Sequence, residues 1–172
     1  MIKCNASGDE TVNIGRFQCG IAAVIYHPQT KTYLLLQRSE KCDGRGNEWE
    51  SVTGRVNQGE SFETALHREV REELGIIVQL EFIVGTSHFY RGEPTPENEL
   101  LGIKYICTLN DRDTVQIGEE HTAFCWLTAK QVYSMLPSIH WLHQTIQQAE
   151  LIRNAVSPEL ITAFRMATFQ TD

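Results

Sequence analysis

The sequence predicts a single α/β domain in which helices pack on both faces of a mixed β-sheet. Strand-like apolar segments alternate with helical segments along the chain. The length of 172 residues suits one domain with a real core, and its 41% hydrophobic content is ordinary for a globular protein. No repeat, low-complexity block or linker divides the chain. These patterns do not determine the order of the strands in the sheet.

The strands can be placed from their apolar and β-branched residues. Residues 17–39 read as two strands joined by a turn at 27–32, where a proline and polar residues break the pattern. Residues 50–54 form a short strand after a loop. The remaining chain predicts three further strands, at 76–90, 103–109 and 122–127. A polar loop with two prolines separates the first two of these.

Four helices are predicted. The first runs from about Ser61 to Leu74 and ends at Gly75, because glycine readily adopts the left-handed conformation of a C-terminal cap. The other three are each expected to begin at a residue that favours a helix start: Thr128, Ser138 and Ser157. The second of these three should continue to about Asn154.

The overall charge excludes some classes of protein. The chain has 15 basic and 22 acidic residues and a formal net charge of −7, which argues against nucleic-acid and membrane-surface partners. It has no apolar run that could cross a bilayer, and its polar start lacks a signal-peptide pattern. Five widely spaced cysteines form no C-x-x-C pair: Cys4, Cys19, Cys42, Cys107 and Cys125. Free thiols in a reducing cytoplasm are expected.

The helix predicted at 61–74 carries carboxylates where its apolar stripe should continue. Positions three and four apart share a helical face, so the stripe reads Phe62, Ala65, Leu66, Glu69, Val70, Glu73 and Leu74. Glu72 lies beside Glu69, which turns three carboxylates at least partly toward the protein. A solvated acidic face is the plain alternative. The interrupted stripe and the glycines of the preceding loop favour a site for Mg²⁺ or Mn²⁺, which prefer oxygen ligands.

Residues 54–76 resemble the signature of the Nudix hydrolases. That signature is a Gly, five residues, a Glu, seven residues, then Arg-Glu-aliphatic-any-Glu-Glu-any-Gly-aliphatic. Every fixed position is met, by Gly54, Glu60, Arg68, Glu69, Val70, Glu72, Glu73, Gly75 and Ile76. The resemblance implies an α/β/α sandwich with a mixed sheet, and one Nudix domain with C-terminal helices over residues 1–172. Many members read Pro-Gly-Gly before the signature, whereas this chain reads Val-Thr-Gly at 52–54.

The resemblance also implies a metal-assisted hydrolysis of a diphosphate linkage, with Mg²⁺ or Mn²⁺ as cofactor. Glu69 and Glu73 map onto the usual metal ligands, and Glu72 onto a further ligand or a residue that orients water. Glu120 is our choice for a ligand from a distant loop, with Glu119 as its competitor. Two residues of the signature are expected to join loop and helix by an ion pair: Glu60 and Arg68.

Within the family, the chain is similar to pyrophosphohydrolases that act on dihydroneopterin triphosphate and nucleoside triphosphates. By that resemblance Arg38 and Thr53 contact the substrate, with Arg16 as a weaker candidate. A solvated strand end for Arg38 and a locally bonded hydroxyl for Thr53 are the plain alternatives. Other nucleoside diphosphate-linked substrates and a non-catalytic ligand-binding domain stay open as functions. The partner is expected to be a small phosphoanhydride, and the chain a monomer or homodimer.

Overall fold

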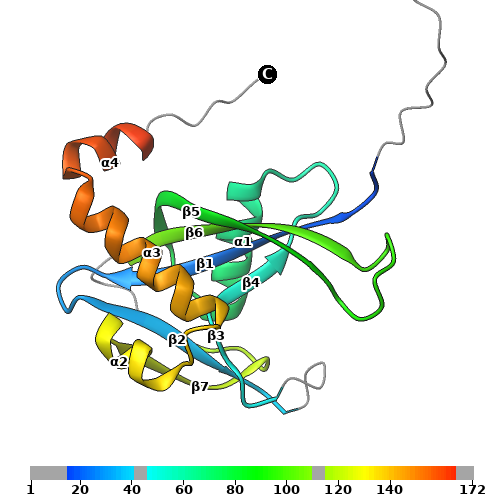
Figure 1. Cartoon of the computed structure of the whole chain (residues 1–172), viewed down its shortest axis with the longest axis horizontal. Helices are drawn as coiled ribbons and strands as arrows, with labels where there is room; N and C mark the ends of the chain where they lie inside the picture. Colours follow the sequence, from blue (N-terminus) through cyan, green and yellow to red (C-terminus); the bar gives the residue numbers. More distant parts are fainter. Residues whose placement is uncertain (1–14, 41–45, 110–114, 166–172) are drawn as a thin grey trace, which may run out of the picture.

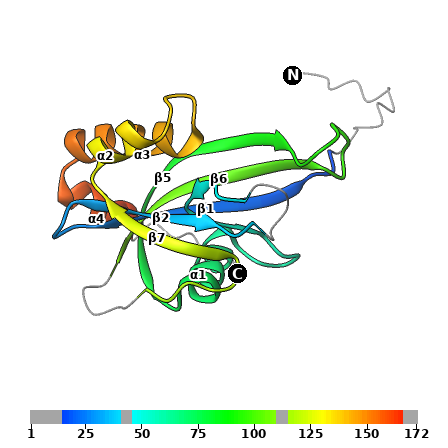
Figure 2. The same ribbon diagram turned by 90° about the horizontal axis from the view of Figure 1, so that it is seen from below.

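In the computed structural model, which describes residues 15–40, 46–109 and 115–165, a mixed sheet of seven strands has helices on both faces (Figures 1 and 2). The strands are β1 (Gln18–His27), β2 (Thr32–Arg38), β3 (Trp49–Glu50), β4 (Val52–Arg55), β5 (Val78–Tyr90), β6 (Glu99–Leu109) and β7 (His121–Leu127). The predicted α/β class and the turn between the first two strands are confirmed.

Strand β1 organises the sheet. The main path runs β3-β2-β1-β6-β5, while β4 pairs with β1 and β7 pairs with β2. Among the described strand pairs only β1 and β6 run parallel, with Gly20 opposite Gly102 and Ala22 opposite Lys104. Strand β4 runs antiparallel to β1, which brings Thr53 opposite Ala22. The loop that precedes helix α1 therefore starts from the centre of the sheet.

Helix α1 (Phe62–Leu74) has the ends that its sequence predicts. The Ser61 side chain accepts a hydrogen bond from the Thr64 backbone N–H, and this satisfies one of the amides that a helix leaves unpaired. Gly75 caps the other end at a φ of 65°, a left-handed conformation that glycine adopts without steric cost. The cap fixes where the chain leaves the helix to enter β5.

The remaining helices are α2 (Ala129–Met135), α3 (Trp141–Ala155) and α4 (Pro158–Arg165). Thr128 caps α2 through a capping box, as predicted. The prediction that Ser138 caps α3 is wrong, because the backbone first turns, with the His140 N–H bonded to the Pro137 carbonyl. The His140 ring then accepts from the Leu142 N–H and caps the helix.

Two apolar cores lie on the two faces of the sheet. Helix α1 packs Leu66, Val70 and Leu74 against side chains of β1 that include Ile21 and Ala23. Helices α2 and α3 cover the opposite face, where the core contains Val24, Tyr33, Leu142 and Ile146 (Figure 2). Successive residues of β1 thus serve opposite cores, as the alternation of a strand requires.

Three cysteines in the described part of the chain are free thiols, namely Cys19, Cys107 and Cys125. Cys4 and Cys42 lie outside the described residues, as does the polar start of the chain. None of the helices within the described ranges is long and apolar enough to span a membrane.

Candidate active site

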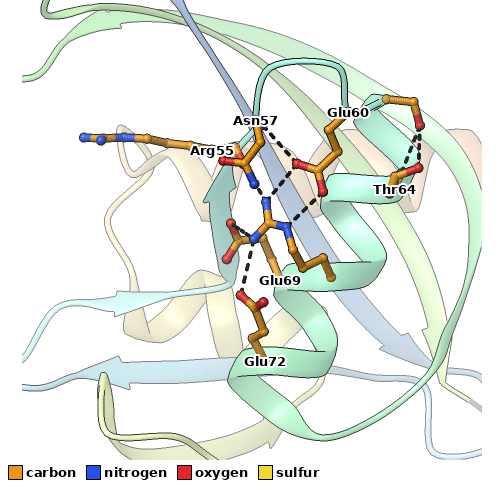
Figure 3. Close-up of polar contacts among 8 residues, drawn as sticks. Arg55, Asn57, Glu60, Thr64, Glu69 and Glu72 are labelled. Atoms are coloured by element: carbon orange, nitrogen blue, oxygen red, sulfur yellow. Dashed lines mark hydrogen bonds and ion pairs between the residues drawn. The ribbon is translucent and has the colours of Figure 1, made fainter.

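The guanidinium of Arg68 ties the loop before α1 to the helix itself. It donates to both carboxylate oxygens of Glu60, at 2.9 and 3.0 Å, and to the Arg55 carbonyl at 2.9 Å. It also contacts Glu69 at 2.8 Å and Glu72 at 3.3 Å (Figure 3). The predicted ion pair between Glu60 and Arg68 is confirmed. A planar fork of donors suits this role, because it can serve several carboxylates in a fixed geometry.

Gly54 leaves room for the Glu69 carboxylate. A Cβ atom built at position 54 would lie 2.0 Å from the carboxyl carbon of Glu69 and 2.2 Å from one of its oxygens. No side chain fits there, so glycine is required by the approach of the carboxylate and not by its own backbone angle. The strand end and the helix thereby hold the carboxylate of Glu69 close against the backbone.

Glu73 is buried on the face of α1 that packs against the sheet. It is 9% exposed, and its Oε2 atom has no hydrogen-bond partner in the described structure. Burial raises the pKa of Glu73 to about 9, and the nearby charges of Glu120, Glu69 and Glu50 raise it as well. A carboxylate that costs this much to ionise needs a positive partner.

Behind Glu73 lies a buried chain of charged and polar groups from β2, β3 and β7. Arg38 Nη1 donates to Glu50 Oε1 at 2.7 Å, and His121 Nε2 lies 3.2 Å from the same oxygen. His121 Nδ1 lies 3.8 Å from Glu73 Oε2. Burial raises the pKa of Glu50, but hydrogen bonds from His121 and Arg38 outweigh it and hold the pKa below its usual value. The sequence analysis did not single out Glu50.

Glu73 and Arg38 border a pocket of about 250 Å³, called here the carboxylate pocket. It is lined by three acidic, three basic and two small residues: Glu69, Glu73, Glu120, Arg38, Arg55, Arg91, Thr53 and Gly54. No group of three acidic, histidine or cysteine side chains in the described ranges lies close enough to hold a metal ion as it stands. Arg68 donates a hydrogen bond of 2.8 Å to one oxygen of Glu69.

The other predicted site residues have different surroundings. Thr53 lines the carboxylate pocket, and so does Glu120, whereas Glu119 is not among the described residues that line it. The side chain of Glu72 is 62% exposed, so the expectation of a third inward-facing carboxylate is wrong. It sits on the flank of α1, away from the sheet. Arg16 is exposed ahead of β1 and borders none of the pockets described here.

A second cavity, called here the sheet pocket, has a volume of about 350 Å³ and was not predicted. It lies on the sheet beside the start of α3, with Trp141 at one side and residues of β1, β5 and β6 beneath and around it. The two pockets share three lining residues, which are Thr53, Gly54 and Arg91. The two pockets therefore adjoin each other at these residues.

Carboxylates and arginines thus line one pocket, beside a helix that follows a glycine-bearing loop. The chain belongs to the family described as the NUDIX domain, whose model matches residues 16–148. The expected class of enzyme, a hydrolase acting on phosphoric anhydride bonds, is confirmed at the level of this family.

Curated relatives resemble most of this chain. It is 31% identical over 143 residues to the dihydroneopterin triphosphate diphosphatase of Escherichia coli (strain K12), a match that covers 74% of this chain and 89% of that protein. It is 30% identical over 122 residues to an octanoyltransferase of Myxococcus xanthus. The second match covers 71% of this chain but only 33% of the relative, so the chain spans about a third of that protein's length.

Solved structures share the fold. The E. coli dihydroneopterin triphosphate pyrophosphohydrolase matches with a TM-score of 0.61 at 27% identity, covering 77% of this chain and 96% of that one. A MutT protein from Methanosarcina mazei Go1 matches with a TM-score of 0.64 at 23% identity, covering 84% and 99%. The predicted sandwich with a mixed sheet is confirmed.

Proposed function

We propose that this chain is a metal-dependent pyrophosphohydrolase that splits a nucleoside or pterin triphosphate into a monophosphate and pyrophosphate. The carboxylate pocket carries the proposal, because it combines acidic side chains with arginines and adjoins a second pocket that could hold the rest of a substrate. The relatives named dihydroneopterin triphosphate diphosphatase support the choice of triphosphates.

The donor set fits Mg²⁺ or Mn²⁺. Carboxylate oxygens are the ligands these cations prefer, and Glu73 offers a buried oxygen with no hydrogen-bond partner among the described residues. Glu69, Glu73 and Glu120 would hold the cation, since all three line one pocket. Glu72 is exposed and bonded to Arg68, and it would add a further ligand or orient water. A bound divalent cation supplies positive charge for phosphate oxygens and lowers the pKa of water.

The basic residues of the carboxylate pocket would bind the phosphates. Arg55 and Arg91 are exposed cations at its edge, and arginine can donate two parallel hydrogen bonds to a phosphate. Arg38 lines the same pocket but is buried and paired with Glu50, so its main contribution is to fix that carboxylate. Thr53 and Gly54, at the junction of both pockets, would lie beneath the substrate where its two halves meet.

Metal binding should be detectable without substrate. Millimolar Mg²⁺ or Mn²⁺ should raise the melting temperature of the protein, because a ligand that binds only the native state stabilises it. Excess EDTA should reverse the shift and abolish turnover. Thermal unfolding followed with and without each cation tests this. Full activity in excess EDTA would rule out a metal-assisted reaction.

The products identify the reaction. Dihydroneopterin triphosphate and the deoxynucleoside triphosphates should each yield pyrophosphate and a monophosphate, and hydrolysis in ¹⁸O-water should label the phosphorus that water attacks. Nucleotide sugars and dinucleoside polyphosphates, assayed in parallel, serve as alternative phosphoanhydrides. Release of orthophosphate from a triphosphate would contradict cleavage between the α- and β-phosphates. If the protein cleaves a nucleotide sugar and leaves triphosphates intact, it is a hydrolase of the same family with a different class of substrate. Ligand binding without turnover of any phosphoanhydride would indicate a non-catalytic domain.

A further inference from the structure

The floor of the sheet pocket is nearly bare backbone. Gly20 on β1 lies opposite Gly102 on β6, and both line the pocket. A Cβ atom added at Gly102 would lie 2.5 Å from the Ser87 hydroxyl oxygen, and one at Gly20 would lie 3.1 Å from the Gly54 carbonyl oxygen. Glycine inside a strand often marks a place where a ligand or another chain segment approaches closely. Neither glycine adds a side chain to this floor, so a ring could approach the backbone of the two strands beside the Ser87 hydroxyl.

The walls of the pocket are apolar. Phe89 on β5, Leu100 on β6 and Trp141 at the start of α3 line it. Phe89 is 42% exposed, so its ring is accessible to a ligand. Aromatic side chains in the lining favour a heteroaromatic ring, since base–aromatic stacking contributes about 1–3 kcal/mol.

Two basic residues line the sheet pocket, Arg91 and Lys104. Arg91 also lines the carboxylate pocket, whereas Lys104 does not. Lys104 stands on β6 opposite Ala22 and is partly buried. Within the described ranges its ammonium group has no hydrogen bond or ion pair. Burial is the cause that lowers its pKa, with no contribution from a carboxylate, although Glu50 lines the same pocket. A desolvated lysine on an apolar wall lacks a partner that a ligand could supply.

The chemistry of that partner is restricted. An ammonium group only donates hydrogen bonds, so the ligand must present an acceptor. The phosphates belong in the carboxylate pocket, where arginines and the acidic cluster lie, and this leaves an atom of the ring for Lys104. Guanine presents two adjacent acceptors, O6 and N7, whereas adenine places an amino donor at the first of these positions. A 4-oxopteridine offers the matching pair, O4 and N5.

We propose that Lys104 selects oxo-substituted bicyclic rings by donating a hydrogen bond to the ring oxygen, the acceptor that adenine lacks. The ring lies on the glycine floor with its triphosphate extending past Thr53 and Gly54 into the carboxylate pocket. This inference rests on the proposed function, because it assigns the ring of that same triphosphate substrate. A site built around such a bond discriminates against an analogue that lacks the acceptor.

The test compares dGTP with dATP for the native protein and for Lys104→Met, which keeps the length of the apolar stem. The substitution should lower kcat/KM for dGTP about tenfold, the scale of one lost hydrogen bond to a charged group, and leave dATP nearly unchanged. Lys104→Arg should recover part of the preference. Lys130→Ala, on exposed α2, is the matched control and should change neither value. Equal losses for both nucleotides, or no loss, would overturn the inference.

A binding measurement separates this inference from the proposed function. Calorimetry of dGMP and dAMP with metal-free protein needs no turnover. Lys104→Met should weaken dGMP binding about tenfold and leave dAMP binding unaltered. If the native protein cleaves no triphosphate, the proposed function fails, and the dGMP result still decides the role of Lys104. Unchanged dGMP binding in the variant would overturn that role even if triphosphates are cleaved.

Discussion

Replacing Glu73 by Gln should lower turnover about a thousandfold, which corresponds to about 4 kcal/mol of lost transition-state stabilisation. The amide keeps the size of the side chain but removes the charge that we assign to the metal. The affinity for Mg²⁺, measured by calorimetry, should fall in parallel. The fold should survive, because Glu73 Oε2 makes no hydrogen bond in the described structure that the substitution would break.

The same substitution should stabilise the metal-free protein, by an amount that grows with pH. The pKa of Glu73 is raised to about 9 from an ordinary value of 4.5. Between these values the native state holds a proton that the unfolded chain has released, so this group makes stability fall as the pH rises. At pH 7 the penalty relative to acid is about 3 kcal/mol, and Gln does not carry it. Urea unfolding in EDTA at pH 5 and pH 8 measures the difference.

Two neighbouring variants sharpen this result. Glu120→Gln should reduce turnover strongly, since Glu120 lines the carboxylate pocket, whereas the exposed neighbour Glu119→Gln should have little effect. The pair differs by one position in the same turn, so a general disturbance of the turn would affect both.

An inactive Glu73→Gln that has also lost its folded circular dichroism spectrum would contradict the assignment.

Replacing Arg38 by Met should destabilise the fold by about 3 kcal/mol. The two side chains of the Arg38–Glu50 ion pair are each 9% exposed, and the two groups are 2.7 Å apart. Removing the guanidinium leaves the buried Glu50 carboxylate in contact with His121 but without its arginine partner, and an uncompensated buried charge is costly. The midpoint of urea unfolding at pH 7 provides the measurement.

The double variant Arg38→Met/Glu50→Met is the control. Removing both partners of a buried pair leaves no stranded charge, so the double variant should lose less stability than the sum of the two single variants. Additive losses would show that the two groups contribute independently. Residual kcat/KM of the folded single variant then reports whether Arg38 also affects the substrate.

Local features of the fold were predictable, because their causes lie close together in the sequence. The periodicity of α1, its Ser61 and Gly75 caps and the ion pair of Glu60 with Arg68 depend on residues within one loop and one helix. The start of α3 was misjudged because Ser138 is an equally good capping residue by type. The turn that begins at Pro137 moves the start of the helix to His140, and the sequence pattern did not predict that turn.

Contacts that the sequence does not show are made only through the sheet. Glu50 lies on β3 and His121 on β7, and both strands pair with β2. This pairing brings the His121 ring within 3.2 Å of the Glu50 carboxylate. Lys104 enters the sheet pocket because β6 lies parallel to β1. Strand order and register are set by long-range packing, so no local pattern could have indicated these contacts.

The parallel pairing of β1 with β6 has a consequence for how the protein folds. The pairing that sets Gly20 against Gly102 closes a chain loop of about eighty residues. The chain loses conformational entropy on closing this loop before the contacts between the two strands can stabilise the fold. Helix α1, which depends on neighbouring residues, can form early during synthesis, whereas the floor of the sheet pocket cannot exist until β6 has left the ribosome. Substitutions along β1 and β6 should therefore slow refolding more than equally destabilising ones at the end of α3.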